Sequence, residues 1–292
     1  MATVTAAAPS LLSDKIIAAV KSQLPILDSV STVLSPTLGQ RGKSVQVSLM
    51  TAGTASKFDK SSNTYATVDG STLSSATVTL DHYKFVDEFD PLTVQEYGEQ
   101  YLINAFAPNA ALAVSKAIWA DIGAIVTNAN YSTKTTVAVA DFGVDDMAAA
   151  MKQLDDAKAA TPRSFVLGNG YVASLRNDSK IVNSLNPATF GALTTGQFPQ
   201  IFGANVYQWN DIPNNSENLA GFALGADAIA FASGLPLAVI PGFQSSVSTD
   251  ASGLGIQVLV GQSETGMLRC VATLLGGVKK GRGTSLTRLV TA

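Results

Sequence analysis

The first 43 residues contain one segment with helical periodicity. Pro25 would end this helix, because a proline inside a helix removes a backbone hydrogen bond. Prolines and glycines interrupt the sequence from there up to residue 43. We therefore expect residues 1–43 to form an arm with a single helix over residues 10–24. One face of this helix is defined by apolar residues at helical spacing, namely Leu12, Ile16, Ile17, Val20 and Leu24.

From residue 44 the apolar period becomes two, which is typical of half-buried strands. Residues 44–49 alternate regularly and predict a first strand. The return strand over residues 76–86 is apolar on one face up to Leu80 and on the other from Tyr83, which indicates a bulge or a strong twist. A two-stranded hairpin is marginal in water by itself. We therefore expect this long, polar hairpin to lean on another surface, and a neighbouring subunit is the first candidate.

Two helices are predicted after the hairpin. Asp90 suits the N-cap position and Pro91 the first helical position. Pro108 is expected to break or kink this helix, and a second helix then covers residues 109–128. Twenty helical residues span about 30 Å, so we expect the second helix to be the longest in the chain.

The rest of the chain alternates helical and extended patterns without an internal repeat. Helices are predicted over residues 145–158 and 171–175, and a basic tail closes the chain. Short apolar runs bounded by turn residues predict strands over residues 164–167, 206–209, 219–224, 255–260 and 267–275.

Composition narrows the function classes. Charged residues make up 14% of the 292 residues, against about 25% in an average soluble domain, which favours a subunit whose surface is covered by neighbours. A net charge of −3 argues against a dedicated basic nucleic-acid binder. One His and one Cys exclude a Cys/His zinc site and an internal disulfide. We see no secretory or transmembrane segment and expect the chain to stay in a reducing cytosol.

One motif resembles a dinucleotide-binding turn. Gly168, Gly170 and Ala173 fit G-x-G-x-x-A between a predicted strand and a predicted helix. The acidic residue that should follow about 20 positions later, to bind the ribose, is absent. We therefore interpret the segment as a tight structural turn and keep a nucleotide-dependent enzyme as an alternative.

Acidic and basic residues are segregated along the sequence. The acidic middle group suits helix capping and a solvated or partner-facing patch, with acid–base catalysis or cation binding as alternatives. The basic end could pair with it between copies of the chain, or make weak contacts with nucleic acid. The acidic group is Asp81, Asp87, Glu88, Asp90, Glu96 and Glu99, and the basic group is Arg269, Lys279, Lys280, Arg282 and Arg288.

The single histidine and the single cysteine are both interpreted as structural. His82 has no serine in a G-x-S-x-G motif to form a hydrolase triad, so we expect it to be packed or hydrogen-bonded. Cys270 lies in an apolar strand and is expected to be a buried, inert thiol. We expect no catalytic, cofactor-binding or metal site.

The order of these parts resembles the major capsid proteins of tailed bacteriophages, which have the Hong Kong 97-like fold. The resemblance covers nearly the whole chain and rests on element order. A polar hairpin returns through VTLDHYKFVDEFD into the helical stretch EYGEQYLINAFAPNAALAVSKAIWADIGAIV. An α/β region with FVLGNGYVASLRN and GFALGADAIAFA follows, and the chain ends in strands closing with MLRCVATLLGGVKKG.

The resemblance implies an α+β fold with named parts. An N-terminal arm covers residues 1–43 and an extended loop, the β-hairpin, covers residues 44–86. An axial α/β domain covers residues 140–245. A peripheral domain combines residues 87–139, including a spine helix at about 109–128, with residues 246–292.

The implied function is a structural protein and not an enzyme. The chain would assemble as pentamers and hexamers into an icosahedral shell around double-stranded DNA, in the virion, after assembly in the host cytoplasm. An encapsulin-type nanocompartment shell is the alternative with the same fold. The expected contacts between subunits are Lys57, Phe58, Lys60, Tyr65, Glu96, Glu99, Lys279, Lys280 and Arg282.

The resemblance also suggests partners and one departure. A separate scaffolding protein, a portal and a decoration protein are expected partners, with DNA contacted only weakly and non-specifically, and no membrane. Some members of the family join a loop lysine to an asparagine of a neighbour's peripheral domain. Lys57 and Lys60 lie in the hairpin, but no asparagine follows Asn218. We therefore expect a shell without covalent bonds between chains.

Overall fold

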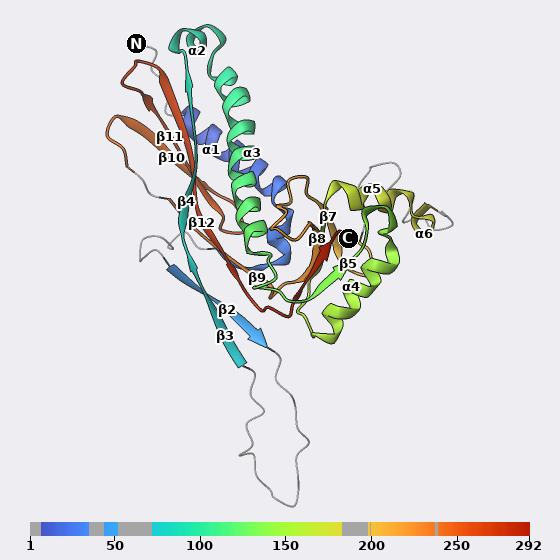
Figure 1. Ribbon diagram of the computed structural model, residues 1–292. Coiled ribbons are helices and arrows are strands. Elements are labelled where there is room, and N and C mark those ends of the chain that lie inside the picture. The colour runs from blue at the N-terminus through green and yellow to red at the C-terminus, as the bar shows by residue number, and fades with distance from the viewer. Residues whose placement is uncertain (1–6, 35–43, 52–71, 183–197, 199, 237–238) are drawn as a thin grey trace, which may run out of the picture.

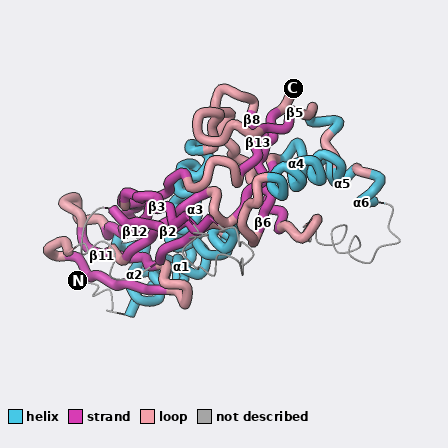
Figure 2. Tube along the Cα trace, turned by 90° about the horizontal axis from the view of Figure 1, so that it is seen from below, coloured by secondary structure: helices cyan, strands magenta, loops and turns pink. Residues whose placement is uncertain are grey.

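The computed structural model describes residues 7–34, 44–51, 72–182, 198, 200–236 and 239–292 (Figure 1). Two sheets form the body, and a two-stranded hairpin extends from it. Figure 2 shows α1, α2 and α3 grouped towards one end of the molecule and α4, α5 and α6 towards the other. The α+β class expected from the sequence is confirmed.

The larger sheet is built around one long strand, β12. Strand β4 pairs with one edge of β12, while β11 and β9 follow each other along the opposite edge. The strands of this sheet are β1 (Ser31–Leu34), β9 (Ile229–Gly234), β12 (Leu268–Lys280), β11 (Gly255–Gln262), β10 (Phe243–Thr249) and β4 (Asp81–Phe89).

Helices α1 (Ala7–Gln23) and α3 (Glu99–Ile125) pack together against this sheet. The apolar face predicted for the first helix is buried, and Leu12 and Ile16 are fully covered. The described part of the expected arm, residues 7–34, therefore contributes to the main core, and α1 is followed by a 3-10 helix, η1 (Pro25–Ser29), and by β1. Proline at the start of η1 is the residue that we expected to end the helix, which it does.

The long helix differs from the prediction at Pro108. Helix α3 runs through Pro108, and the break lies at Gly98, after the short helix α2 (Pro91–Tyr97). Gly98 has a φ of +77°, which a residue with a side chain adopts only with strain. Pro108 is exposed, and so is Asn104, whose carbonyl loses its helical partner to the proline, so water can satisfy it. Asp90 caps α2 as predicted, because its Oδ1 accepts from the Leu92 amide at 3.0 Å.

The smaller sheet has the spatial order β5-β13-β8-β6-β7. A second apolar cluster fills the space between it and its helices. The strands are β5 (Lys134–Thr136), β13 (Leu286–Val290), β8 (Leu219–Gly225), β6 (Arg163–Leu167) and β7 (Asn205–Gln208). The helical segments are η2 (Val139–Asp141), α4 (Val144–Asp156), α5 (Asn169–Asn177) and α6 (Ser179–Val182).

The two sheets exchange strands in a way that differs from the expected domain boundaries. Strand β9 was expected in the axial domain but pairs with β12 in the larger sheet. Strands β5 and β13 were expected in the peripheral domain but pair with each other in the smaller sheet. The physical reason is that the chain crosses between the sheets in short turns, at residues 226–228 and 281–285, which hydropathy does not mark.

The hairpin consists of β2 (Ser44–Thr51) and β3 (Thr72–Thr79), paired antiparallel. We expected the apolar face of the hairpin to need a neighbouring subunit, but it is covered within the chain. Val47, Val78 and Leu80 pack on Ala230, Ala232 and Leu275. The face switch predicted in the return strand lies at Leu80, where the strand leaves β2 and joins β12.

The crossing of β3 over β12 is tight at one position. A Cβ atom added to Gly277 would overlap the carbonyl oxygen of Thr79. Glycine therefore lets the hairpin backbone cross directly over the strand of the main sheet.

Candidate interaction surfaces

The hairpin carries four of the residues expected to contact neighbours. Lys57, Phe58, Lys60 and Tyr65 lie outside the described residues, so their contacts remain predictions. The structure does describe β2 and β3, the two strands that flank these residues in the sequence. Thr51 and Thr72 face each other as the last described pair of the hairpin, which extends away from the body (Figure 1).

The end of the molecule around α2 exposes apolar side chains. Leu92 is 73% exposed and Tyr97 is 64% exposed. A series of ring contacts runs outward from the buried Phe106 through Phe89 to Tyr101 and Tyr97. Apolar groups exposed together at one end of a monomer are typical of a contact surface.

Two expected contact residues lie at this same end. Glu96 is exposed on α2. Glu99 is the first residue of α3. Glu96 thus lies on the same short helix as the exposed Leu92 and Tyr97, and Glu99 begins the next helix along the chain. Their contacts with neighbours stay predictions.

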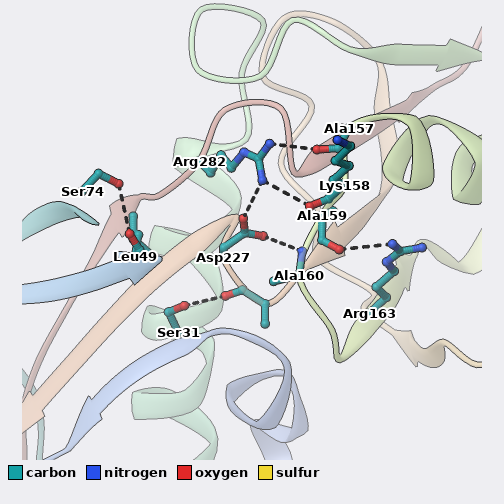
Figure 3. A network of polar contacts seen from close by, with 11 residues as sticks. Ser31, Leu49, Ser74, Ala157, Lys158, Ala159, Ala160, Arg163, Asp227 and Arg282 are labelled. Atoms are coloured by element: carbon teal, nitrogen blue, oxygen red, sulfur yellow. Dashed lines mark hydrogen bonds and ion pairs between the residues drawn. The ribbon is translucent and has the colours of Figure 1, made fainter. Parts of the chain in front are cut away.

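The three basic residues expected to contact neighbours have different surroundings. Lys279 is exposed on β12. Lys280 has its Nζ 5.9 Å from the ring centroid of Tyr131, a cation–π distance. Arg282 follows β12 in the turn to β13 and is engaged within its own chain (Figure 3).

Arg282 joins both crossings between the sheets to the end of α4. Its Nη1 lies 3.4 Å from the Asp227 carboxylate. It also donates to the carbonyls of Ala157 at 2.8 Å and Lys158 at 3.2 Å, which favours a cation at this helix C-terminus. Asp227 in turn accepts from the Ala160 amide at 3.1 Å. Arg282 therefore connects the two crossings to α4 within its own chain, as Figure 3 shows, and its contact with a neighbouring subunit stays a prediction.

The basic residues nearest the end of the sequence pair mainly within the chain as well. Arg269 lies opposite Glu88 in the β4–β12 register, and its Nη2 is 2.6 Å from the carboxylate. Arg288 is paired with Glu217. The charge pairing that we expected between copies is therefore made, at Arg269, Arg282 and Arg288, inside one chain.

Arg288 is a structural residue that the sequence analysis did not identify. It lies on β13, in the segment interpreted as a basic tail, and is 1% exposed. Its Nε donates to the Tyr131 carbonyl and its Nη2 to Asn128 Oδ1, both at 2.7 Å. Burial lowers the pKa of its guanidinium group. The signal that could have identified it is the set of apolar residues on both sides of it, Leu286, Leu289 and Val290, which form a short run of the kind found in a buried strand.

Aromatic and amide side chains add contacts between α3, with the residues that follow it, and the segments after β7 and β8. Trp119 of α3 stacks on Trp209 just after β7, with ring centroids 4.9 Å apart. The side-chain amide of Asn215 donates to carbonyls at the end of α3, those of Gly123 at 2.9 Å and of the C-cap residue Val126 at 2.6 Å. Tyr131 donates to the Ala228 carbonyl at 2.7 Å.

The glycine motif is part of the packing between β6 and β8. The Gly168 amide donates to the Ala220 carbonyl at 2.8 Å. A Cβ at Gly170 would meet Val139 at 2.9 Å, and neither glycine has a positive φ. Gly170 is therefore required for close packing and not for an unusual backbone conformation. The amide that a pyrophosphate would need at Gly168 already has a protein acceptor.

The single cysteine, Cys270, and the single histidine, His82, differ in their exposure to solvent. Cys270 is buried, and burial together with the charge of Asp87 raises the pKa of its thiol to about 12, which matches an inert thiol. His82 is exposed on β4, so of the two expected roles, packed or hydrogen-bonded, the packed one is wrong and the hydrogen-bonded one stays a prediction. Its neighbour Tyr83 points the other way and donates to Asp121 of α3. Burial, with the Asp121 carboxylate, raises the pKa of this tyrosine.

Further features bear on chemistry. Among the described residues, no group of three or more His, Cys, Asp or Glu side chains is placed to hold a metal ion. None of the helices in the described part of the chain is long and apolar enough to span a membrane.

A cavity of about 710 Å³ lies between the end of α1, α3 and β7, and its described lining residues, which include Gln23, Trp119 and Tyr207, carry no charged side chain.

Comparisons with known proteins link this architecture to capsids. No protein-family model and no curated protein matches the chain. The capsid protein of cyanophage P-SCSP1u matches with a TM-score of 0.55 and 15% identity over 90% of this chain and 86% of that chain. A virus-like particle from Pyrococcus furiosus matches with a TM-score of 0.56 and 11% identity, and the match covers 95% of this chain and 97% of that chain. The mature capsid of bacteriophage PhiM1 matches with a TM-score of 0.54 and 9% identity over 90% and 86%.

Proposed function

We propose, since the chain has the Hong Kong 97-like fold of phage capsid proteins, that it is a major capsid protein. In this proposal it assembles as pentamers and hexamers into an icosahedral shell that encloses double-stranded DNA. The observation that carries the proposal is the coverage of the structural match, about nine-tenths of both chains. A match of that extent spans most of the chain and is not confined to one common substructure.

The surface of the chain supports a role in assembly. Charged residues are few, at 14%, and exposed apolar groups gather at α2. A monomer in free solution would gain little from these features, whereas a shell subunit covers them with its neighbours. We propose Lys57, Phe58, Lys60 and Tyr65 on the hairpin, and Glu96, Glu99, Lys279 and Lys280, as residues of such contacts.

A nanocompartment shell is the second candidate. The match to the virus-like particle from Pyrococcus furiosus covers 97% of that chain, and this observation favours it. Both candidates require self-assembly of the same fold. They differ in the contents, which are DNA in a virion and enzyme cargo in an encapsulin-type compartment.

A nucleotide-dependent enzyme has less support. The Gly168 amide is used by Ala220 and the ribose-binding acid is missing. The structural role proposed here needs no catalytic group. In a virion, further partners would be a scaffolding protein, a portal and a decoration protein, and DNA would be held by weak, non-specific contacts.

The proposed function predicts large, closed particles. The purified chain, expressed alone or with a scaffolding partner, is expected to elute at megadalton size and to show uniform shells by electron microscopy. Nucleic acid extracted from particles made during infection would support the virion, and a co-purifying enzyme would support the nanocompartment. A chain that stays monomeric under both conditions would contradict both candidates.

The shell is expected to be held without covalent bonds between chains. No asparagine follows Asn218 to accept a lysine, and the one cysteine is buried. Particles that are boiled in detergent and reductant should therefore run as one band near the chain mass of 30.2 kDa. A ladder of multimers on the denaturing gel would show that another pair of residues forms a cross-link.

A further inference from the structure

Strand β4 forms an open edge of the larger sheet. It pairs with β12 on one side, and no other described strand pairs with it. Helix α3 packs on both β4 and β12, so it covers one face of the strand, and within the described part of the chain the outer edge has no paired strand. An open edge of this length offers unpaired backbone groups to a further strand.

The exposed face of β4 carries a charge pattern that reverses about its centre. His82, Lys84, Val86, Glu88 and, just beyond the strand, Asp90 alternate along this face, and all five are exposed. Basic groups precede Val86 and acidic groups follow it at equal distances. When such a strand meets a second copy of itself antiparallel, each basic residue lies opposite an acidic one.

We propose that β4 pairs with β4 of a second copy across a two-fold axis at Val86, which joins the two larger sheets. In this register Val86 faces Val86 of the other copy, and Lys84 faces Glu88 twice. Directly opposed residues of opposite charge stabilise an antiparallel pair, and like charges destabilise it. A two-fold contact uses the same patch on both copies, which is why a self-complementary strand is needed.

The local contacts are compatible with this pairing. Glu88 keeps its ion pair with Arg269, which lies on the opposite side in the β4–β12 register. Lys84 of the second copy approaches the same carboxylate from the open edge. Val86, at 45% exposure, is a large apolar residue that the pairing would cover.

The proposal adds a specific contact to the proposed function and rests on it only in that copies of the chain must meet. A Val86→Cys variant tests it directly. Opposed residues in antiparallel strands have Cα atoms about 4.5–5.5 Å apart, within the range that a disulfide bridges. Under mild oxidation we expect a band at twice the chain mass, with the buried Cys270 unreactive.

His82→Cys is the matched control. It is exposed on the same face of the same strand, but four positions from the axis on each copy, so its two thiols would lie about 27 Å apart. We expect no linked pair from it. Equal linking by both variants, or none by Val86→Cys, would overturn the proposal. If particles still form while Val86→Cys does not link, the strand pairing is wrong and the shell function stands.

Reversal of the charges at Lys84 and Glu88 tests whether disulfide linking depends on the proposed register or on random collisions. In the Val86→Cys background, Lys84→Glu alone and Glu88→Lys alone should each reduce linking roughly tenfold, because each sets like charges opposite one another twice. An equal mixture of the two variants should restore it, since the mixed pair is again complementary. Lys152→Glu, at an exposed lysine of α4, should leave linking unchanged. Failure of the mixture to restore linking would overturn the proposed register.

Discussion

Replacement of residues 52–71 by an Asn-Gly turn is expected to abolish closed particles while the subunit stays folded. Thr51 and Thr72 are directly opposed in the hairpin, so a two-residue turn can close the strands there. The apolar base of the hairpin remains packed on β9 and β12. The deletion thus removes four of the proposed contact residues and keeps the described strand pairs of the hairpin.

Size-exclusion chromatography and electron microscopy measure this result. The deletion variant should elute far below megadalton size, and its circular dichroism should match that of the full chain. The matched control is Lys57→Ala together with Lys60→Ala, which keeps the length of the hairpin and tests whether its charges matter. Particles of normal size from the deletion variant would remove the hairpin from the assembly mechanism.

Arg288→Ala is expected to lower stability more than the removal of any other charged side chain among the described residues, because Arg288 is buried. The substitution removes the hydrogen bonds to Tyr131 and Asn128 and the ion pair with Glu217. Loss of one partner from a buried ion pair costs about 3–5 kcal/mol. In a chain of this size the melting temperature would fall by roughly 10 °C.

The measurement is best made in the soluble hairpin-deletion background, where assembly does not add to stability. Arg269→Ala is the control, since it removes an ion pair of the same kind from an exposed site, with Arg269 side-chain exposure of 42%. Exposed pairs contribute about 0–1 kcal/mol. Equal melting temperatures for the two variants would show that the buried contacts of Arg288 contribute no more to stability than an exposed ion pair does.

Periodicity predicted most of the elements correctly. The first helix, the hairpin strands, the cap at Asp90 and the strands β6, β8, β11 and β12 lie where apolar spacing places them. These signals are local, because a buried face must repeat with the period of its own element. The fold class followed from the order of such elements.

The predictions were wrong where contacts with residues distant in the sequence determine the local structure. Pro108 stays helical because packing of α3 outweighs the loss of one exposed hydrogen bond. Strand β13 was missed because Arg288 looks like a solvated charge until Glu217, far away in the sequence, is placed beside it. Lys57, Lys60 and Arg282 stay untested as contacts between subunits, although Arg282 has a partner within its chain that its sequence position did not reveal.

The pairing of β4 with β12 has a kinetic consequence. Glu88 and Arg269 touch although 181 positions separate them in the sequence, and Arg288 bonds to Tyr131 across 157 positions. Chains dominated by such non-local contacts fold slowly, because the entropy of long loops is lost before the contacts form. Unpaired strand edges are exposed during that time and can aggregate. Slower synthesis at lower temperature should therefore raise the yield of soluble subunit more than it would for a helical protein of the same length.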